Sequence, residues 1–274
     1  MHAAAAQGRS PWIDLISGFE KDLGGHSDRF RRGELMQLSS IAAQIYEYVA
    51  RPKCKFPWPK SQGRHASLVR SLSLILPADE VSPAFPYSED NREQANRSIR
   101  SLISPLLKGA DRQLAANLAV WIVKDWGGIR AGPEAVRNWS DQLGDFSACS
   151  IESFVREKGR TRISSWSKVL AFASPDSEAI YDSRTAVALN CALAKLGHTS
   201  GFYMPLGRNA AIVPVYRTFR NLGFRQVYGY LEYVELLKEM AKHHPDGDVL
   251  GVEMSLFAKA PTLALNFRSE IDRK

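Results

Sequence analysis

Apolar residues recur at intervals of three and four residues along most of this chain, which is the spacing of one face of an α-helix. Strict alternation of polar and apolar residues, which a half-buried strand requires, is scarce. We therefore predict an all-α, multi-helix globular protein with little or no sheet. Helices are predicted near residues 65–75, 91–108, 112–126, 133–143, 151–158, 164–173, 183–196, 210–221, 227–243 and 249–260.

Proline-rich stretches divide the N-terminal part of the chain. Two helices are predicted before residues 51–62, whose three prolines are incompatible with an ordered helix. Residues 77–90 contain three more prolines and are predicted to be a linker. We therefore expect two closely packed helical subdomains, residues 1–80 and residues 81–274.

The composition fits a globular protein with a polyanionic partner. With 274 residues, of which 45% are hydrophobic, the chain is long enough to bury a large core. Its net charge of +7 and isoelectric point near 9.3 favour nucleic acid, because each basic side chain placed at a phosphate releases a counterion. A solvated basic surface explains the charge equally well.

Neither a membrane span nor a disulfide framework is expected. No apolar run approaches the length that crosses a bilayer, and the first residues lack the basic start and apolar stretch of a signal peptide. Cys54, Cys149 and Cys191 are too scattered for a disulfide framework or an iron–sulfur site. We therefore expect a cytoplasmic monomer without a cofactor or a metal.

The stretch 156–190 contains the residues on which a functional prediction depends. A basic loop precedes a helix whose first turns include Lys168, and an extended return leads to Asp182, which is placed to cap the next helix. The helix from 168 to 173 rises only about 8 Å. Eight extended residues span roughly 26 Å, so the return can bring Asp182 back beside Lys168. The basic residues of the loop are Arg156, Lys158, Arg160 and Arg162.

An amine beside a carboxylate at two helix N-termini suits attack on the anomeric carbon of a sugar. Backbone N–H groups there, together with the basic loop, can hold a phosphate. The amine is then the nucleophile, and the carboxylate stabilises an oxocarbenium-like sugar or accepts a proton. Taken singly, Asp182 is explained as a helix cap and Lys168 as a solvated helix lysine, so the hypothesis depends on the pair.

Two segments of this stretch resemble the helix-hairpin-helix (HhH-GPD) DNA glycosylase superfamily. They are Ser167-Lys168-Val169-Leu170 and Ile180-Tyr181-Asp182-Ser183-Arg184. The resemblance implies that Lys168 is a Schiff-base nucleophile and that Asp182 is the essential carboxylate. It also implies excision of a damaged or modified base from double-stranded DNA, with or without abasic-site lyase activity. One relative that it suggests is a bacterial phage-defence glycosylase acting on hypermodified cytosine.

The chain departs from the family pattern in three respects. Ser165-Trp166-Ser167 replaces the hairpin glycines, the spacing from lysine to aspartate is a few residues shorter, and no cysteine cluster follows. The last difference excludes the iron–sulfur branch. In this degenerate hairpin we assign Ser165, Ser167 and the four basic residues to DNA binding. Trp166 is a candidate wall of a base pocket, although core packing explains it equally well.

A second segment, Trp126-Gly127-Gly128-Ile129-Arg130, resembles the loop with which this family enters the duplex. Base extrusion needs a wedge because the stack hides the glycosidic bond. We assign Gly127 and Arg130 to DNA binding and Trp126 to the base pocket. A glycine that simply ends a helix is the alternative explanation.

Two other classes of function fit the same sequence. A non-catalytic helical protein would bind DNA or RNA through the basic face, and a helical interaction protein would have the charge excess incidentally. Salt-dependent DNA binding separates the first two hypotheses from the third, and release of a base separates the glycosylase from the non-catalytic binder. A metal site at His243-His244, Asp246 and Asp248 is not favoured, because adjacent helical histidines point in different directions.

Overall fold

The computed structural model describes residues 38–50, 62–85, 92–144, 146–207 and 209–273. Contacts between Cα atoms group residues 39–274 into one unit, separate from residues 1–38. The first of the two helices predicted before residue 51 therefore lies outside the described residues, as do Cys54 and most of the stretch 51–62. The boundary predicted between residues 80 and 81 falls inside a helix of the larger unit.

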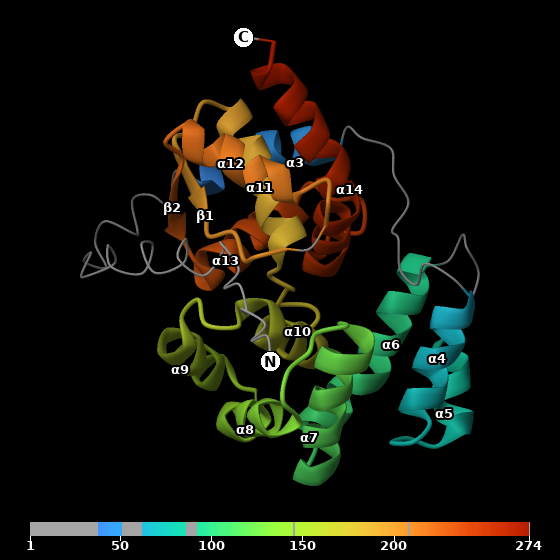
Figure 1. The fold of residues 1–274 in the computed structure, drawn as a ribbon. Coiled ribbons are helices and arrows are strands. Elements are labelled where there is room, and N and C mark those ends of the chain that lie inside the picture. Colours follow the sequence, from blue (N-terminus) through green and yellow to red (C-terminus); the bar gives the residue numbers. More distant parts are fainter. Residues whose placement is uncertain (1–37, 51–61, 86–91, 145, 208, 274) are drawn as a thin grey trace, which may run out of the picture. The chain divides into compact units, whose positions relative to one another are not determined.

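Helices form most of the described chain, and the predicted all-α class is confirmed (Figure 1). Within the described ranges, no helix combines the length and the apolar character that a bilayer span requires. The helices are α3 (Ala42–Ala50), α4 (Gln62–Leu72), α5 (Ala78–Ala84), α6 (Arg92–Lys108), α7 (Arg112–Trp121), η1 (Ile122–Trp126), α8 (Pro133–Leu143), α9 (Ala148–Lys158), α10 (Ile163–Ala173), α11 (Ser183–Lys195), α12 (Val213–Asn221), α13 (Tyr230–Ala241) and α14 (Val249–Ile271).

The two central helices of the larger unit, α10 and α11, pack against different partners. α10 contacts α6, η1 and α8, whereas α11 contacts α14, α3 and the strand β1 (Ser200–Phe202). Residues 174–182 join these two helices, and in Figure 1 they run from the green group of helices to the orange and red one. Among the described residues, this connecting segment is therefore a covalent link between the helices packed around α10 and those packed around α11.

Two prolines lie among helical residues that the sequence analysis did not predict to be helical. Residues 77–90 are predicted to be a linker, but α5 forms there, with Pro83 near its end where the missing N–H removes a single hydrogen bond. The helix predicted over 249–260 continues as α14 to Ile271, past Pro261. Buried residues follow Pro261 as well as precede it, so packing holds this helix together across the proline.

Two predicted helices each contain a second kind of element. The end of the helix predicted over 112–126 is the π-helix η1, in which Gly127 N donates to Ile122 O at 2.8 Å. The start of the helix predicted over 227–243 belongs to the strand β2 (Arg225–Tyr228), which pairs in parallel with β1. Strands of three and four residues are too short for periodicity to detect.

Asn190 fastens this small sheet to α11. Its buried side chain donates to Phe202 O at 2.8 Å and accepts from Phe202 N at 2.7 Å. A Cβ at Gly201 would lie 2.4 Å from Asn190 Oδ1, so only glycine permits this close approach. The loop that follows β1 consequently begins from a fixed position beside α11.

Candidate active site

Helices α9 and α10 are joined by a hairpin that runs from Gly159 to Arg162. Both of these residues have a positive φ, +53° at Gly159 and +54° at Arg162. Gly159 N donates to Val155 O at 2.8 Å at the end of α9, and Ser165 N donates to Arg162 O at 2.8 Å at the start of α10. The chain thus forms a helix, a short hairpin and a second helix, with backbone strain at the non-glycine Arg162.

Ser167 fixes the return segment against α10. Its hydroxyl accepts from Tyr181 N at 3.0 Å and donates to Tyr181 O at 3.3 Å. Lys168 follows Ser167 in the sequence and Asp182 follows Tyr181, so these two hydrogen bonds bring the lysine and the aspartate into one site. The prediction that the return segment reaches back to α10 is confirmed. The prediction that it is extended throughout is wrong, because residues 175–177 form a turn in which Glu178 N donates to Ser174 O at 2.8 Å.

Asp182 caps α11. Its Oδ1 accepts from Arg184 N at 2.8 Å and from Thr185 N at 3.1 Å. In return, Asp182 N donates to Thr185 Oγ1 at 3.0 Å. The carboxylate is therefore held at the positive end of a helix by two backbone donors. The explanation as a helix cap holds, and Asp182 is half-buried rather than enclosed.

Lys168 is almost completely buried, with 6% of its surface exposed. Its Nζ donates to Ser164 O at 2.9 Å. Burial lowers the pKa of the Lys168 amine from that of a free lysine. The charges of Asp182 and Glu253 oppose this lowering of the pKa, whereas the charge of Arg100 adds to it. The explanation as a solvated lysine is therefore wrong, and burial favours the neutral form of the amine relative to that of a free lysine.

Gly127 lies against the side chain of Lys168. A Cβ on Gly127 would be 2.9 Å from Lys168 Cδ and 2.8 Å from Val123 O. The φ of Gly127 is −77°, so close packing rather than backbone conformation requires glycine here. The following Gly128 has a φ of +64° and ends the helix, as the alternative explanation expects. The segment thus forms one wall of the lysine site.

The two tryptophans assigned to a base pocket have different surroundings. Trp126 is half-buried, and its ring packs edge-on against Phe172 with 4.9 Å between the centroids. Trp166 is 0% exposed, its Nε1 donates to Thr161 O at 2.8 Å, and its ring packs edge-on against Tyr230. The prediction that Trp166 lines a base pocket is therefore wrong in this conformation, since no face of the ring is open to a base.

The serines of the hairpin region are also enclosed. Ser165 and Ser167 are both buried, and the hydroxyl of Ser167 is engaged by Tyr181. The assignment of Ser167 to a DNA contact is corrected accordingly, because this residue is 0% exposed and its hydroxyl is bonded to the Tyr181 backbone. Ser165 is 6% exposed, as Lys168 is, and its assignment stays a prediction. The glycines of the family pattern are replaced here by side chains that pack into the core.

The basic residues assigned to DNA binding differ in how they are engaged. Arg162 and Arg130 are exposed. Arg156 pairs with Glu152 at 2.7 Å, and Lys158 pairs with Glu157 at 2.6 Å. Arg160 Nη2 donates to Gln226 O at 2.8 Å, and its guanidinium lies 4.9 Å from the centroid of the Tyr203 ring. Arg160 therefore also has a structural role, because it ties the hairpin to β2.

Sequence analysis missed an ion pair beside this site. Arg100 of α6 and Glu253 of α14 are both buried and form two hydrogen bonds, of 3.0 and 2.7 Å. A signal was present in the sequence: Arg100 falls within the apolar stripe of α6 formed by Ile99, Ile103 and Leu107. A charged residue in a buried stripe needs a partner, but the sequence does not reveal which one.

The packing of the loop after β1 against the start of α11 was not predicted from the sequence. A Cβ on Gly207 would lie 2.5 Å from Ser183 Oγ, so this loop is packed directly against the residue that follows Asp182. Tyr216 holds the loop by donating its hydroxyl to Pro205 O. Between these two anchors Leu206 is 75% exposed. A fixed loop beside Asp182 thus presents an apolar side chain to solvent.

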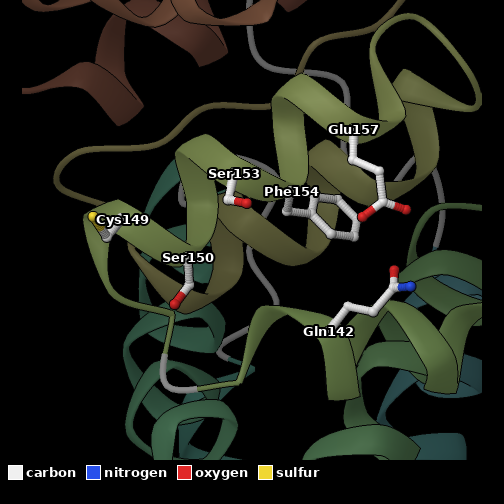
Figure 2. A pocket seen from close by; sticks show the side chains of 6 residues that line it. All are labelled: Gln142, Cys149, Ser150, Ser153, Phe154 and Glu157. Atoms are coloured by element: carbon white, nitrogen blue, oxygen red, sulfur yellow. The ribbon is translucent and has the colours of Figure 1, made fainter.

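A pocket of about 410 Å³ lies between α8 and α9, at a different place (Figure 2). None of its lining residues belongs to the lysine–aspartate site. In Figure 2 the amide of Gln142 and the carboxylate of Glu157 approach it from the two helices. The lining residues are Gln142, Cys149, Ser150, Ser153, Phe154 and Glu157.

In the part of the chain that the structure describes, no three His, Cys, Asp or Glu side chains are grouped so as to hold a metal ion. Asp246 and Asp248 instead pair with Arg97, at 2.7 and 2.5 Å. Comparison of the chain with protein families, with curated proteins and with solved structures finds no match.

The contact between Gly127 and Lys168 generates a testable prediction. Gly127→Ala is expected to lower the free energy of unfolding by about 1–3 kcal/mol, because the new Cβ would overlap both Val123 O and Lys168 Cδ. The matched control is Gly132→Ala, since nothing lies within 4 Å of a Cβ there and φ is −65°. Urea denaturation measures both variants, and equal stability would contradict the described packing.

Proposed function

We propose that this protein is a DNA glycosylase that cleaves the N-glycosidic bond of a damaged or modified base, with Lys168 as the nucleophile and Asp182 as the essential carboxylate. The buried amine of Lys168 carries this proposal. Its pKa is lowered by burial, and it shares a site with a carboxylate fixed at a helix N-terminus. Amines with a perturbed pKa concentrate at functional sites, because an amine nucleophile must be neutral to react.

The proposed chemistry follows from the two groups. The neutral amine of Lys168 attacks C1′ of the target nucleotide, and the C–N bond that forms replaces the glycosidic bond that breaks. The electron pair of the broken bond leaves with the base, which takes up a proton. Asp182 stabilises the positive charge that develops on the sugar and accepts the proton lost by the amine. In the lyase step, the sugar ring of the covalent intermediate opens as the C1′–O4′ bond breaks, which gives a protonated Schiff base and a hydroxyl at C4′. A base then removes a proton from C2′, and the electron pair of that C–H bond forms a C2′–C3′ double bond as the 3′ phosphate leaves.

Arg162 and Arg130 support a DNA substrate, because both are basic and exposed. Contacts to phosphates position a duplex without reading its sequence. A non-catalytic DNA- or RNA-binding protein, the alternative, would use the same two residues. It would have no use for a buried amine, so Lys168 is the residue that favours the glycosylase.

The decisive experiment is an excision assay on a panel of substrates. Wild-type protein is incubated with duplex oligonucleotides and phage DNA that contain different damaged or hypermodified bases. Alkali then cleaves any abasic site, and borohydride traps any covalent complex. An abasic product on one member of the panel supports the proposal, whereas salt-dependent binding without any product across the panel favours the non-catalytic alternative.

The hairpin arginines are expected to differ in their effects. Arg162→Ala should weaken DNA binding and make the salt dependence shallower by about one phosphate contact. It should leave stability unchanged, because alanine keeps the Cβ and the side chain is exposed. Arg160→Ala should also lower stability, because Arg160 donates to Gln226 O. Titrations at several salt concentrations test this, and unchanged binding of Arg162→Ala would place the hairpin away from DNA.

Asp182→Asn is expected to fold and to lose base excision by about 100- to 1000-fold, the loss that follows removal of one preorganised electrostatic group. The fold should survive because asparagine also caps helices and its Oδ1 can accept from Arg184 N and Thr185 N. Circular dichroism checks folding and single-turnover kinetics measure excision. Wild-type activity in this variant would reduce Asp182 to a helix cap and end the proposed mechanism.

Lys168→Gln is expected to abolish the complex trapped by borohydride. In the wild type, trapping should be lost as the pH falls through the lowered pKa of Lys168, because protonation removes the nucleophilic electron pair. If water is the nucleophile instead, Lys168→Gln retains excision and loses only the lyase step. A wild-type protein that excises a base without ever forming a trapped complex would make Lys168 a DNA contact.

Leu206 is expected to matter only when the target base is paired. Its exposed side chain lies in a loop packed against Ser183, so it is placed to occupy the space that an extruded base leaves in the stack. Leu206→Ala should slow excision from a duplex by about tenfold or more and leave excision from a single strand unchanged. Leu74→Ala is the control, since Leu74 is an exposed leucine elsewhere. Equal losses on both substrates would refute this role.

A further inference from the structure

The ion pair between Arg100 and Glu253 is almost completely buried. The two side chains are 1% and 4% exposed, and they meet through Nη1–Oε2 at 3.0 Å and Nη2–Oε1 at 2.7 Å. Removing two charges from water costs free energy that such a pair does not reliably return as stability. Stability alone therefore does not explain this buried pair, and the other contacts of Arg100 and Glu253 are relevant to its role.

Glu253 has a third hydrogen bond, and it is directed at the return segment. Oε2 of Glu253 accepts from Ile180 N at 2.8 Å, in addition to its bond with Arg100. Two carbonyl groups of the same segment accept hydrogen bonds from tyrosines of α13. Tyr233 donates to Ile180 O at 2.8 Å, and Tyr230 donates to Ala179 O at 3.1 Å. Glu253 thus anchors the backbone two residues before Asp182.

Arg100 connects the same pair to the wall of the lysine site. Its guanidinium lies 5.3 Å from the centroid of Phe172 and 5.9 Å from that of Trp126. Phe172 is one helical turn after Lys168, and Trp126 precedes the glycine that packs on the lysine side chain. The pair therefore contacts both the aromatic rings beside Lys168 and the backbone segment that leads to Asp182.

We propose that Glu253, locked in place by Arg100, is a positioning residue that holds the Asp182 segment beside Lys168. The negative charge of Glu253 also acts on the Lys168 amine. Its role in catalysis rests on the proposed function. Its effect on Lys168 does not, and it is measured without substrate. Glu253 acts through Ile180 and Lys168 rather than by touching the DNA.

Three charged groups act on the Lys168 amine, each from a different element. Asp182 at the start of α11 and Glu253 of α14 favour the charged amine, whereas Arg100 of α6 disfavours it. Removing the charge of Glu253 leaves Asp182 as the one negative group of these three that opposes Arg100. The pKa of Lys168 must then fall further, which is the opposite of what general loosening and hydration of the site would cause.

The test uses the full chain labelled with carbon-13 at the lysine ε position, and Lys168→Gln assigns the Lys168 signal. In Glu253→Gln, which keeps the shape and an acceptor for Ile180 N, the titration midpoint of Lys168 should move to lower pH than in the wild type. The control is Glu270→Gln on the same helix, whose partner is the exposed Lys195, and it should leave the midpoint unchanged. An unchanged or raised midpoint in Glu253→Gln would overturn the electrostatic part of the proposal.

Glu253→Asp tests positioning and also covers the case in which Glu253→Gln does not fold. Aspartate keeps the charge for Arg100 but is one methylene too short to reach Ile180 N as well. The Ile180 amide should exchange its hydrogen at least about tenfold faster, the equivalent of one lost hydrogen bond, while the Lys168 midpoint stays in place. Unchanged protection of Ile180 would overturn the positioning role.

A kinetic readout separates this proposal from the proposed function. On a substrate that the wild type cleaves, Glu253→Asp should lower kcat and leave KM unchanged, because the DNA contacts are intact. An unchanged kcat would overturn positioning of the reaction. If the wild type cleaves no substrate, the proposed glycosylase fails, while the Lys168 titration and the Ile180 exchange still decide whether Glu253 controls these two residues.

Discussion

The hydrogen bonds made by the backbone of residues 179–181 determine the arrangement of everything around them. This stretch is buried and belongs to no helix or strand, so its N–H and C=O groups must find partners elsewhere. The partners are side chains of α10, α13 and α14: one serine, two tyrosines and one glutamate. Three helices that are distant in the sequence are thereby fixed to one short segment, and the orientation of Asp182 follows from them.

The site concentrates polar and charged groups where the rest of the core is apolar. Lys168, Arg100 and Glu253 are all buried. The Arg100 guanidinium lies 5.3 Å from the centroid of the Phe172 ring, which packs against Trp126. Each buried charge costs free energy unless a neighbour compensates it, so none of the three can be changed without affecting the others. This interdependence distinguishes the Lys168 site from the pocket between α8 and α9, where the acidic lining residue Glu157 is exposed and pairs with Lys158.

The sequence was sufficient for those features that depend on neighbouring residues. The helical class, the start of α11 at its aspartate cap and the approach of Asp182 to Lys168 all follow from local periodicity, capping and a short return. Features that depend on distant residues were not predictable. Tryptophan is a residue type that often stacks on ligands, but Trp166 is buried because Phe154 and Tyr230 pack on it. The acceptor for Arg100 lies on another helix, and no local pattern specifies Glu253 as that partner.

The left-handed conformation of Arg162 has a consequence for how this hairpin can vary. A glycine would adopt a φ of +54° without the strain that a Cβ causes, so the backbone alone would favour glycine at this position. Compared with glycine, arginine at this position lowers the folding stability and places a positive charge at the tip of the turn. Substitution by glycine would therefore make the turn easier to form and less basic at the same time. In related chains, glycine at this position would indicate selection for stability, and arginine would indicate selection for the positive charge.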